Sequence, residues 1–273
     1  MAKDKYNGKS ASSGKSSGGT AGKKKYGGGG SSGDSVIPKE ELLEWKKADT
    51  ATYEKAAKDN TPIVLMFLDE EMTAIEANEA LHSKELAELS KSKAAFVLIE
   101  YNADRTPSLD DGCPVPTSKL LSPNPSREYN ISEYITVVVC DQYGNAYNRF
   151  NGSVPSPKDL QKKIDEMAKG IDANNAKLQK NLDAAKKALE AKDQAGFLKA
   201  ALANFKTDLV GLPAQEQTIK AYRELVDGAR SEVNSILEGK PADGEKRLKD
   251  MAKTFKGTEL AKEIEDALEI LKG

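Results

Sequence analysis

Thiol and imidazole side chains are the groups in this sequence whose chemistry would be most distinctive. The chain of 273 residues has two cysteines, Cys113 and Cys140, and one histidine, His82. The cysteines are 27 positions apart, so they form no Cys-x-x-Cys pair. Two interpretations stay open: a regulatory disulfide between them, or a buried core thiol at Cys140. Two cysteines exclude a disulfide-dense scaffold and a four-cysteine metal site.

Carboxylates offer a second kind of chemistry, because hard divalent cations prefer oxygen ligands. Five of them fall into two groups: Asp69, Glu70 and Glu71, and Asp110 and Asp111. Their spacing matches no metal-binding loop, and acids at a helix N-terminus are accounted for by the helix dipole. His82 has no Ser-His-Asp or Cys-His pairing and falls in an amphipathic pattern, so we expect a surface or half-buried residue. No glycine-rich phosphate loop is present. We therefore expect no catalytic, cofactor-binding or metal-ligating residues, no cofactor and no enzyme activity.

Charge divides the chain into three parts. Residues 1–34 are rich in Gly, Ser and Lys, with 7 Lys against 2 Asp, and we expect a disordered tail. This tail is either a solubilising arm or a contact for an anionic surface or the acidic core. Residues 35–170 hold 16 Lys and Arg against 23 Asp and Glu, whereas residues 171–273 hold 18 of each. An acidic core argues against nucleic-acid binding, since phosphate would be repelled.

The chain carries no run of about 18 apolar residues, the length that a membrane-spanning helix needs, and we expect no membrane partner. Its N-terminus lacks the apolar core of a signal peptide. The expected compartment is therefore the cytoplasm, or the periplasm or exterior if a signal was removed beforehand.

Hydrophobic periodicity indicates the elements that must position these groups. Apolar runs predict buried strands at 63–68 and 95–101. A third strand at 135–140 and a short fourth strand at 146–150 are predicted to form a hairpin around the turn Tyr143-Gly144-Asn145. Helical spacing predicts helices over 38–58, 72–92 and 157–169. Residues 104–128, with five prolines, read as a long loop. The order of elements predicts an α/β fold, in which a mixed central sheet has helices on both faces.

Three features stand out in residues 42–170: a helix bearing Trp45, the break at Asn60-Thr61-Pro62 before an apolar strand, and the strand, turn and strand from Tyr134 to Gly152. With these features the segment resembles the thioredoxin-like superfamily. The resemblance implies a three-layer domain. It also implies a Cys-x-x-Cys motif after the first core strand and a *cis*-proline facing it.

Both functional positions of that family differ in this chain. Met72 and Ile75 stand near the places of the two cysteines, and Ile135 stands at the place of the *cis*-proline. Because a non-proline *cis* peptide costs about 3 kcal/mol, we expect a *trans* peptide before Ile135 and a remodelled edge. Dithiol–disulfide exchange is excluded at this position.

From about Asn174 the sequence is helical throughout. Residues 244–272 look like a tetratricopeptide-type helical hairpin, and a plain helical bundle packed on the first domain is the alternative. The predicted domains are a tail (1–34), a thioredoxin-like domain (35–170) and a helical extension (171–273). The leading hypothesis is a noncatalytic binding or scaffold protein whose partner is another protein, with the oligomeric state left open. The rival is a thiol–disulfide oxidoreductase or chaperone-like enzyme that uses Cys113 or Cys140.

Overall fold

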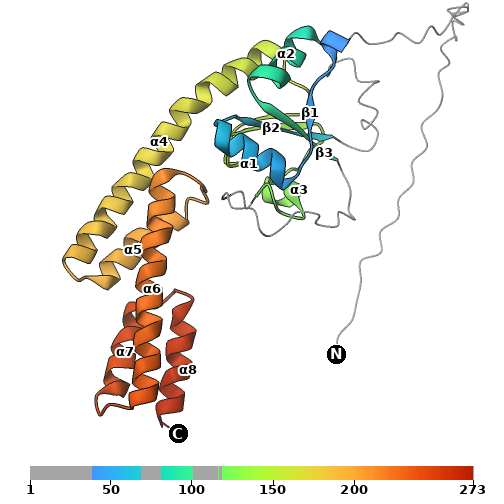
Figure 1. Cartoon of the computed structure of the whole chain (residues 1–273). Helices are drawn as coiled ribbons and strands as arrows, with labels where there is room; N and C mark the ends of the chain where they lie inside the picture. The colour runs from blue at the N-terminus through green and yellow to red at the C-terminus, as the bar shows by residue number, and fades with distance from the viewer. Residues whose placement is uncertain (1–38, 69–80, 101–115, 117–118, 273) are drawn as a thin grey trace, which may run out of the picture. The chain divides into compact units, whose positions relative to one another are not determined.

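The computed structural model describes residues 39–68, 81–100, 116 and 119–272 (Figure 1). Five strands form one sheet in the order β1-β3-β2-β4-β5. Their bounds are β1 Trp45–Lys46, β2 Ile63–Leu68, β3 Ala95–Glu100, β4 Thr136–Cys140 and β5 Ala146–Asn151. Strands β1, β3 and β2 run parallel, while β4 pairs antiparallel with both β2 and β5. The expected α/β class is confirmed: a mixed sheet with helices is followed by a helical region.

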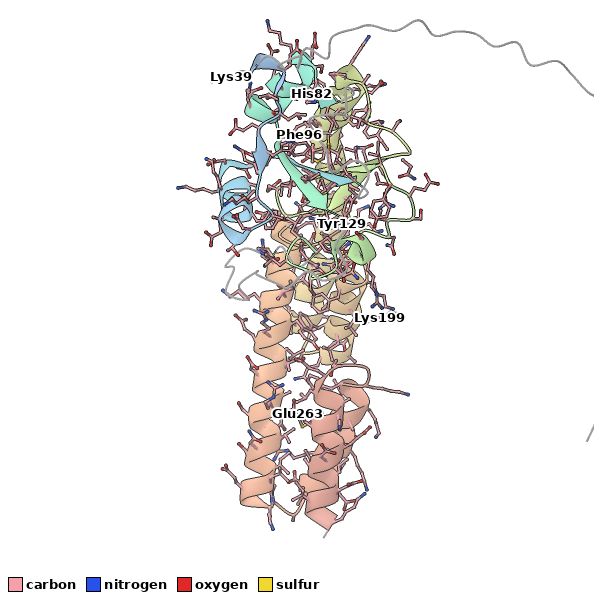
Figure 2. The ribbon with its side chains drawn as sticks, turned by 90° about the vertical axis from the view of Figure 1, so that its right-hand side faces the viewer. Lys39, His82, Phe96, Tyr129, Lys199 and Glu263 are labelled. Carbon is pink, nitrogen blue, oxygen red and sulfur yellow. The ribbon has the colours of Figure 1, made fainter. Side chains whose placement is uncertain are left out.

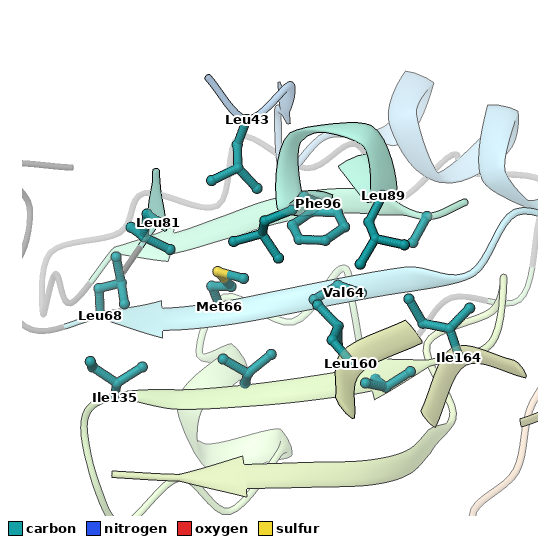
Figure 3. Close-up of a cluster of buried hydrophobic side chains, with 14 of the residues drawn as sticks. Leu43, Val64, Met66, Leu68, Leu81, Leu89, Phe96, Ile135, Leu160 and Ile164 are labelled. Carbon is teal, nitrogen blue, oxygen red and sulfur yellow. The ribbon is translucent and has the colours of Figure 1, made fainter. Parts of the chain in front are cut away.

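The central strand β2 is buried on both faces because all six of its residues are apolar. Side chains of a strand alternate between the two faces of a sheet. Ile63, Leu65 and Phe67 join the core on the side of helix α1 (Thr50–Asp59). Val64, Met66 and Leu68 join the core on the opposite side, beneath helix α2 (Lys84–Ser92) and the first turns of helix α4 (Pro157–Glu190) (Figure 3).

The helix expected over 38–58 is confirmed only from Thr50 onward, and its first half is wrong. Residues Lys39–Glu41 form the short 3₁₀ helix η1, and Trp45 and Lys46 pair with β3 as an edge strand. The α-helix starts only at Thr50, because the Asp49 carboxylate accepts a hydrogen bond from the Thr52 N–H at 2.9 Å and caps it. A two-residue strand is too short to show a periodic pattern of its own, so the helical spacing of the neighbouring apolar residues predicted one continuous helix.

The helix expected over 72–92 is only partly described. Within the described residues, α2 begins at Lys84 because the Ser83 hydroxyl caps it, accepting a hydrogen bond from the Leu86 N–H at 3.1 Å. Met72 and Ile75 lie outside the described residues. The expected loop 104–128 ends in one helical turn, α3 (Pro125–Glu128).

The peptide between Tyr134 and Ile135 is *cis*, so the expected *trans* peptide is wrong. The expectation rested on the general cost for a peptide without tertiary contacts. Here the Ile135 side chain is buried in the sheet core, and its carbonyl accepts a hydrogen bond from the Gly152 N–H at 2.7 Å. The backbone conformation found before proline in the resembling family is thus present without the proline.

Helix α4 continues past Lys169, where the closing helix was expected to end, and runs through the predicted boundary at 170/171. Gly170 does not break it. A Cβ atom at this position would lie 2.7 Å from the Tyr147 ring, so the glycine permits close packing of α4 on β5. Near the end of α4, the Leu189 side chain is 38% exposed.

Four further helices make up the rest of the helical region (residues 171–272): α5 (Gln194–Phe205), α6 (Pro213–Gly239), α7 (Gly244–Thr254) and α8 (Leu260–Lys272). Fully buried Asn204 ties α4, α5 and α6 together. Its amide nitrogen donates to the Leu178 carbonyl at 3.0 Å and to the Thr218 hydroxyl at 2.8 Å. Arg230 of α6 makes a bidentate ion pair with Glu263 of α8, and Figure 2 labels Glu263. No helix among the described residues has the length and apolar character to cross a bilayer.

Candidate functional site

The described residues that the sequence analysis considered for chemistry lie in different parts of the fold. Cys140 ends β4 and is fully buried, Ile135 directly precedes β4, and half-buried His82 precedes α2 (Figure 2). Cys113 and the five candidate cation ligands, Asp69, Glu70, Glu71, Asp110 and Asp111, lie outside the described residues. Across the parts that the structure does describe, no three His, Cys, Asp or Glu residues gather as a metal site. The described candidates therefore form no common catalytic constellation.

Cys140 is a free thiol in an unreactive setting. Burial raises the pKa of the thiol well above its ordinary value, and the neighbouring Asp141 carboxylate raises it further. A hydrogen bond with Tyr129 acts in the opposite direction but does not offset the burial. Because the thiolate is the nucleophilic form, this cysteine is a core residue rather than a redox centre.

A buried polar cluster follows Cys140 in the β4–β5 hairpin. The fully buried Asp141 carboxylate accepts hydrogen bonds from the N–H groups of Tyr143 and Asn145, from the Asn145 amide and from the Tyr147 hydroxyl. Burial raises the pKa of Asp141, although these donors act against the rise. The cluster fixes the shape of the hairpin turn.

The Asn145 side chain links this cluster to the helical region by hydrogen bonds. Its amide nitrogen donates to the Val210 carbonyl at 2.8 Å, and its amide oxygen accepts from the Val210 N–H at 2.9 Å. Gly211 lies directly beneath the Tyr143 ring, where a Cβ atom would be 2.2 Å from the ring. We call Asn145, Val210 and Gly211 with the Tyr143 ring the hairpin joint. It is a structural contact that holds residues 65 positions apart.

A pocket of about 290 Å³ opens among β1, α1 and the C-terminal end of α2. Four lysines line it, and we call it the lysine pocket: Lys46, Lys55, Lys91 and Lys93. Asp59 is the one carboxylate in the lining. Three alanines and four hydroxyl-bearing residues complete it: Ala56, Ala94, Ala95, Thr52, Thr61, Ser90 and Ser92. The small side chains leave the pocket open, and the lysines give it a positive charge.

Two of the four lysines have a carboxylate partner. The Lys55 ammonium lies 2.7 Å from the Asp59 carboxylate, and Lys46 pairs with Glu44. Lys46 lowers the pKa of Glu44 by its hydrogen bond and its charge, and Lys91 adds a smaller effect. Lys91 and Lys93 are exposed and make no ion pair with another described residue. The pocket thus keeps cationic groups available to an anionic ligand.

A second depression of about 320 Å³ adjoins the first and shares Ser92 and Lys93 with it. Two carboxylates, Glu85 and Glu88, face two lysines, Lys93 and Lys158, in its lining. These opposite charges balance, so this depression has no preference for an anion. The lysine pocket is therefore the better candidate for a binding site.

Sequence reasoning did not find the lysine pocket. Its lysines come from three elements and are separated by as many as 47 positions, from Lys46 to Lys93. Only the pairing of β1 with β3 brings Lys46 to the strand that begins just after Lys93. Knowing that short edge strand in advance is the one signal that would have suggested the site.

Comparisons with known proteins add a fold likeness of limited extent. No protein-family model matches the chain, and no curated protein matches its sequence. A solved structure described as DsbH oxidoreductase is similar at 16% identity and a TM-score of 0.34, covering 45% of this chain and 85% of that one. The likeness is too low to carry an argument about what this chain does.

Proposed function

We propose that this chain is a noncatalytic thioredoxin-like module that binds another protein and acts as a scaffold. The lysine pocket is the observation that carries the proposal, because it is an accessible, charged recess of a size that holds side chains of a ligand. None of its described lining residues is a histidine or a cysteine. The Ser90 hydroxyl donates a hydrogen bond to the Ala87 carbonyl and accepts one from the Glu44 N–H. Such a lining suits recognition better than covalent chemistry.

The environment of Cys140 supports the same proposal. A buried thiol with a raised pKa is a poor nucleophile at neutral pH. The rival oxidoreductase function then rests on Cys113. The helical region would contribute further binding surface, either as a tetratricopeptide-like hairpin formed by α7 and α8 or as a plain bundle.

An insulin-reduction assay tests the noncatalytic function. We expect no thiol-dependent turnover from the wild type, and an unchanged result from Cys113→Ser. In that variant Cys140 is the sole thiol. The native protein should therefore not react with a thiol reagent, whereas the unfolded chain should react with one equivalent of reagent per chain. Turnover that disappears in Cys113→Ser would refute the proposal in favour of the oxidoreductase. Rapid native labelling of Cys140 would contradict the burial argument.

A further inference from the structure

Cationic side chains and unused backbone acceptors meet in the lysine pocket. The carbonyl groups of Ser90, Lys91 and Ser92 end α2, and no described residue donates a backbone hydrogen bond to them. The last carbonyls of any helix lack partners within the helix. The same three residues line the pocket. The site therefore offers positive charge and hydrogen-bond acceptors over a short distance.

We propose that the lysine pocket binds an acidic, extended peptide segment of a partner protein. Carboxylate side chains of such a segment would meet the ammonium groups, and its backbone N–H groups would donate to the carbonyls at the end of α2. The proposal rests on the proposed binding function and names the chemistry of the partner. A peptide fits both halves of the site, whereas a ligand without N–H groups fits only one.

A compact phosphate ion fits this site less well. The C-terminal turns of α1 and α2 both border the pocket, and helix C-termini carry a partial negative charge. That charge disfavours a multiply charged ion placed close to the helix ends. The pocket also has no arginine, whose planar fork is the usual match for phosphate. Lysines at the rim suit carboxylates that are spread along a chain.

The lysine pocket is a positively charged recess in a part of the chain that is acidic as a whole. Residues 35–170 hold 16 basic against 23 acidic side chains, yet the pocket has four lysines around one carboxylate. A general attraction between the whole domain and an acidic peptide is therefore excluded. Binding must depend on these particular lysines, which makes the proposal open to a charge-matched test.

The test measures fluorescence anisotropy of a labelled hexaglutamate peptide with the full chain. The pocket variant is Lys55→Gln/Lys91→Gln/Lys93→Gln. The control variant Lys177→Gln/Lys180→Gln/Lys199→Gln removes the same charge from exposed positions of the helical region that make no described ion pair. Figure 2 labels Lys199. All six side chains except Lys55 are free of ion pairs with described residues, so both variants should keep the fold, which circular dichroism checks.

We expect wild type and control variant to bind hexaglutamate with similar affinity and the pocket variant to bind at least about tenfold more weakly. Binding should weaken as salt is raised, and hexaglutamine should not bind. Equal losses in both variants, binding of hexaglutamine, or no binding by wild type would overturn the proposal. Turnover of insulin would overturn the noncatalytic function alone, so the two proposals fail by different results.

Discussion

The hairpin joint allows a quantitative test of how the β4–β5 hairpin holds residue 210. The Asn145 side chain is 1% exposed and makes three hydrogen bonds, two with Val210 and one with the Asp141 carboxylate. Asn145→Ala removes all three and leaves a buried carboxylate oxygen with one donor fewer. At about 1 kcal/mol for each bond, we expect a loss of roughly 3 kcal/mol in the free energy of unfolding.

Thermal and chemical unfolding would measure this loss. For a chain of this size, roughly 3 kcal/mol corresponds to a fall in Tm of about 6–12 °C. Hydrogen exchange gives a local readout, because the Val210 N–H loses its acceptor. Its exchange should accelerate by about tenfold or more, the equivalent of ~1.4 kcal/mol.

Asn148→Ala is the matched control. It makes the same chemical change three positions along the same hairpin, at a side chain that makes no described hydrogen bond. We expect its effect to stay within about 0.5 kcal/mol. The reasoning is refuted if Asn145→Ala lowers Tm no more than Asn148→Ala and leaves exchange of the Val210 amide unchanged.

Two further predictions concern buried polar groups. Asn204→Ala should lower the free energy of unfolding by about 2–4 kcal/mol, since the Leu178 carbonyl and the Thr218 hydroxyl lose a buried donor; a loss below ~0.5 kcal/mol in urea unfolding would contradict this. Burial raises the pKa of Tyr147 to about 12, so this phenol contributes stability below pH 10 that is lost as the pH rises from 10 to 12. Tyr147→Phe should therefore show a shallower decline of stability over that window, and an identical decline in wild type and variant would count against a raised pKa of this half-buried phenol.

Sequence patterns were most informative where a whole segment shares one environment. Ile63–Leu68 is apolar at every position and buried at every position, so its character as a central strand was readable. Trp45–Lys46 is too short for any periodicity, and its strand pairing depends on the distant residues Phe96 and Val97.

Interpretation of single residues depended on their surroundings. The helix predicted over 157–169 continues through Gly170, whose missing side chain serves the packing of Tyr147. Cys140 was readable as a core thiol because it ends an apolar run. The lysine pocket was not readable, because lysines are ordinary surface residues until the fold brings their separate elements to one place. Residue type alone marks a site only when the chemistry is rare, as with thiols.

Because α4 is continuous, it fixes the angle between its apolar stripe that packs on the sheet and its apolar stripe that packs in the helical region. Leu160 and Ile164 face the sheet, whereas Leu178 and Leu182, further along the same helix, face the helical region. Each residue of an α-helix turns the next by about 100°. Inserting one residue between these pairs would turn the second apolar stripe by that angle relative to the first, whereas inserting seven would nearly restore it. The number of residues in α4 therefore fixes the angle between its two apolar stripes, while the hairpin joint fixes how far apart the two cores lie.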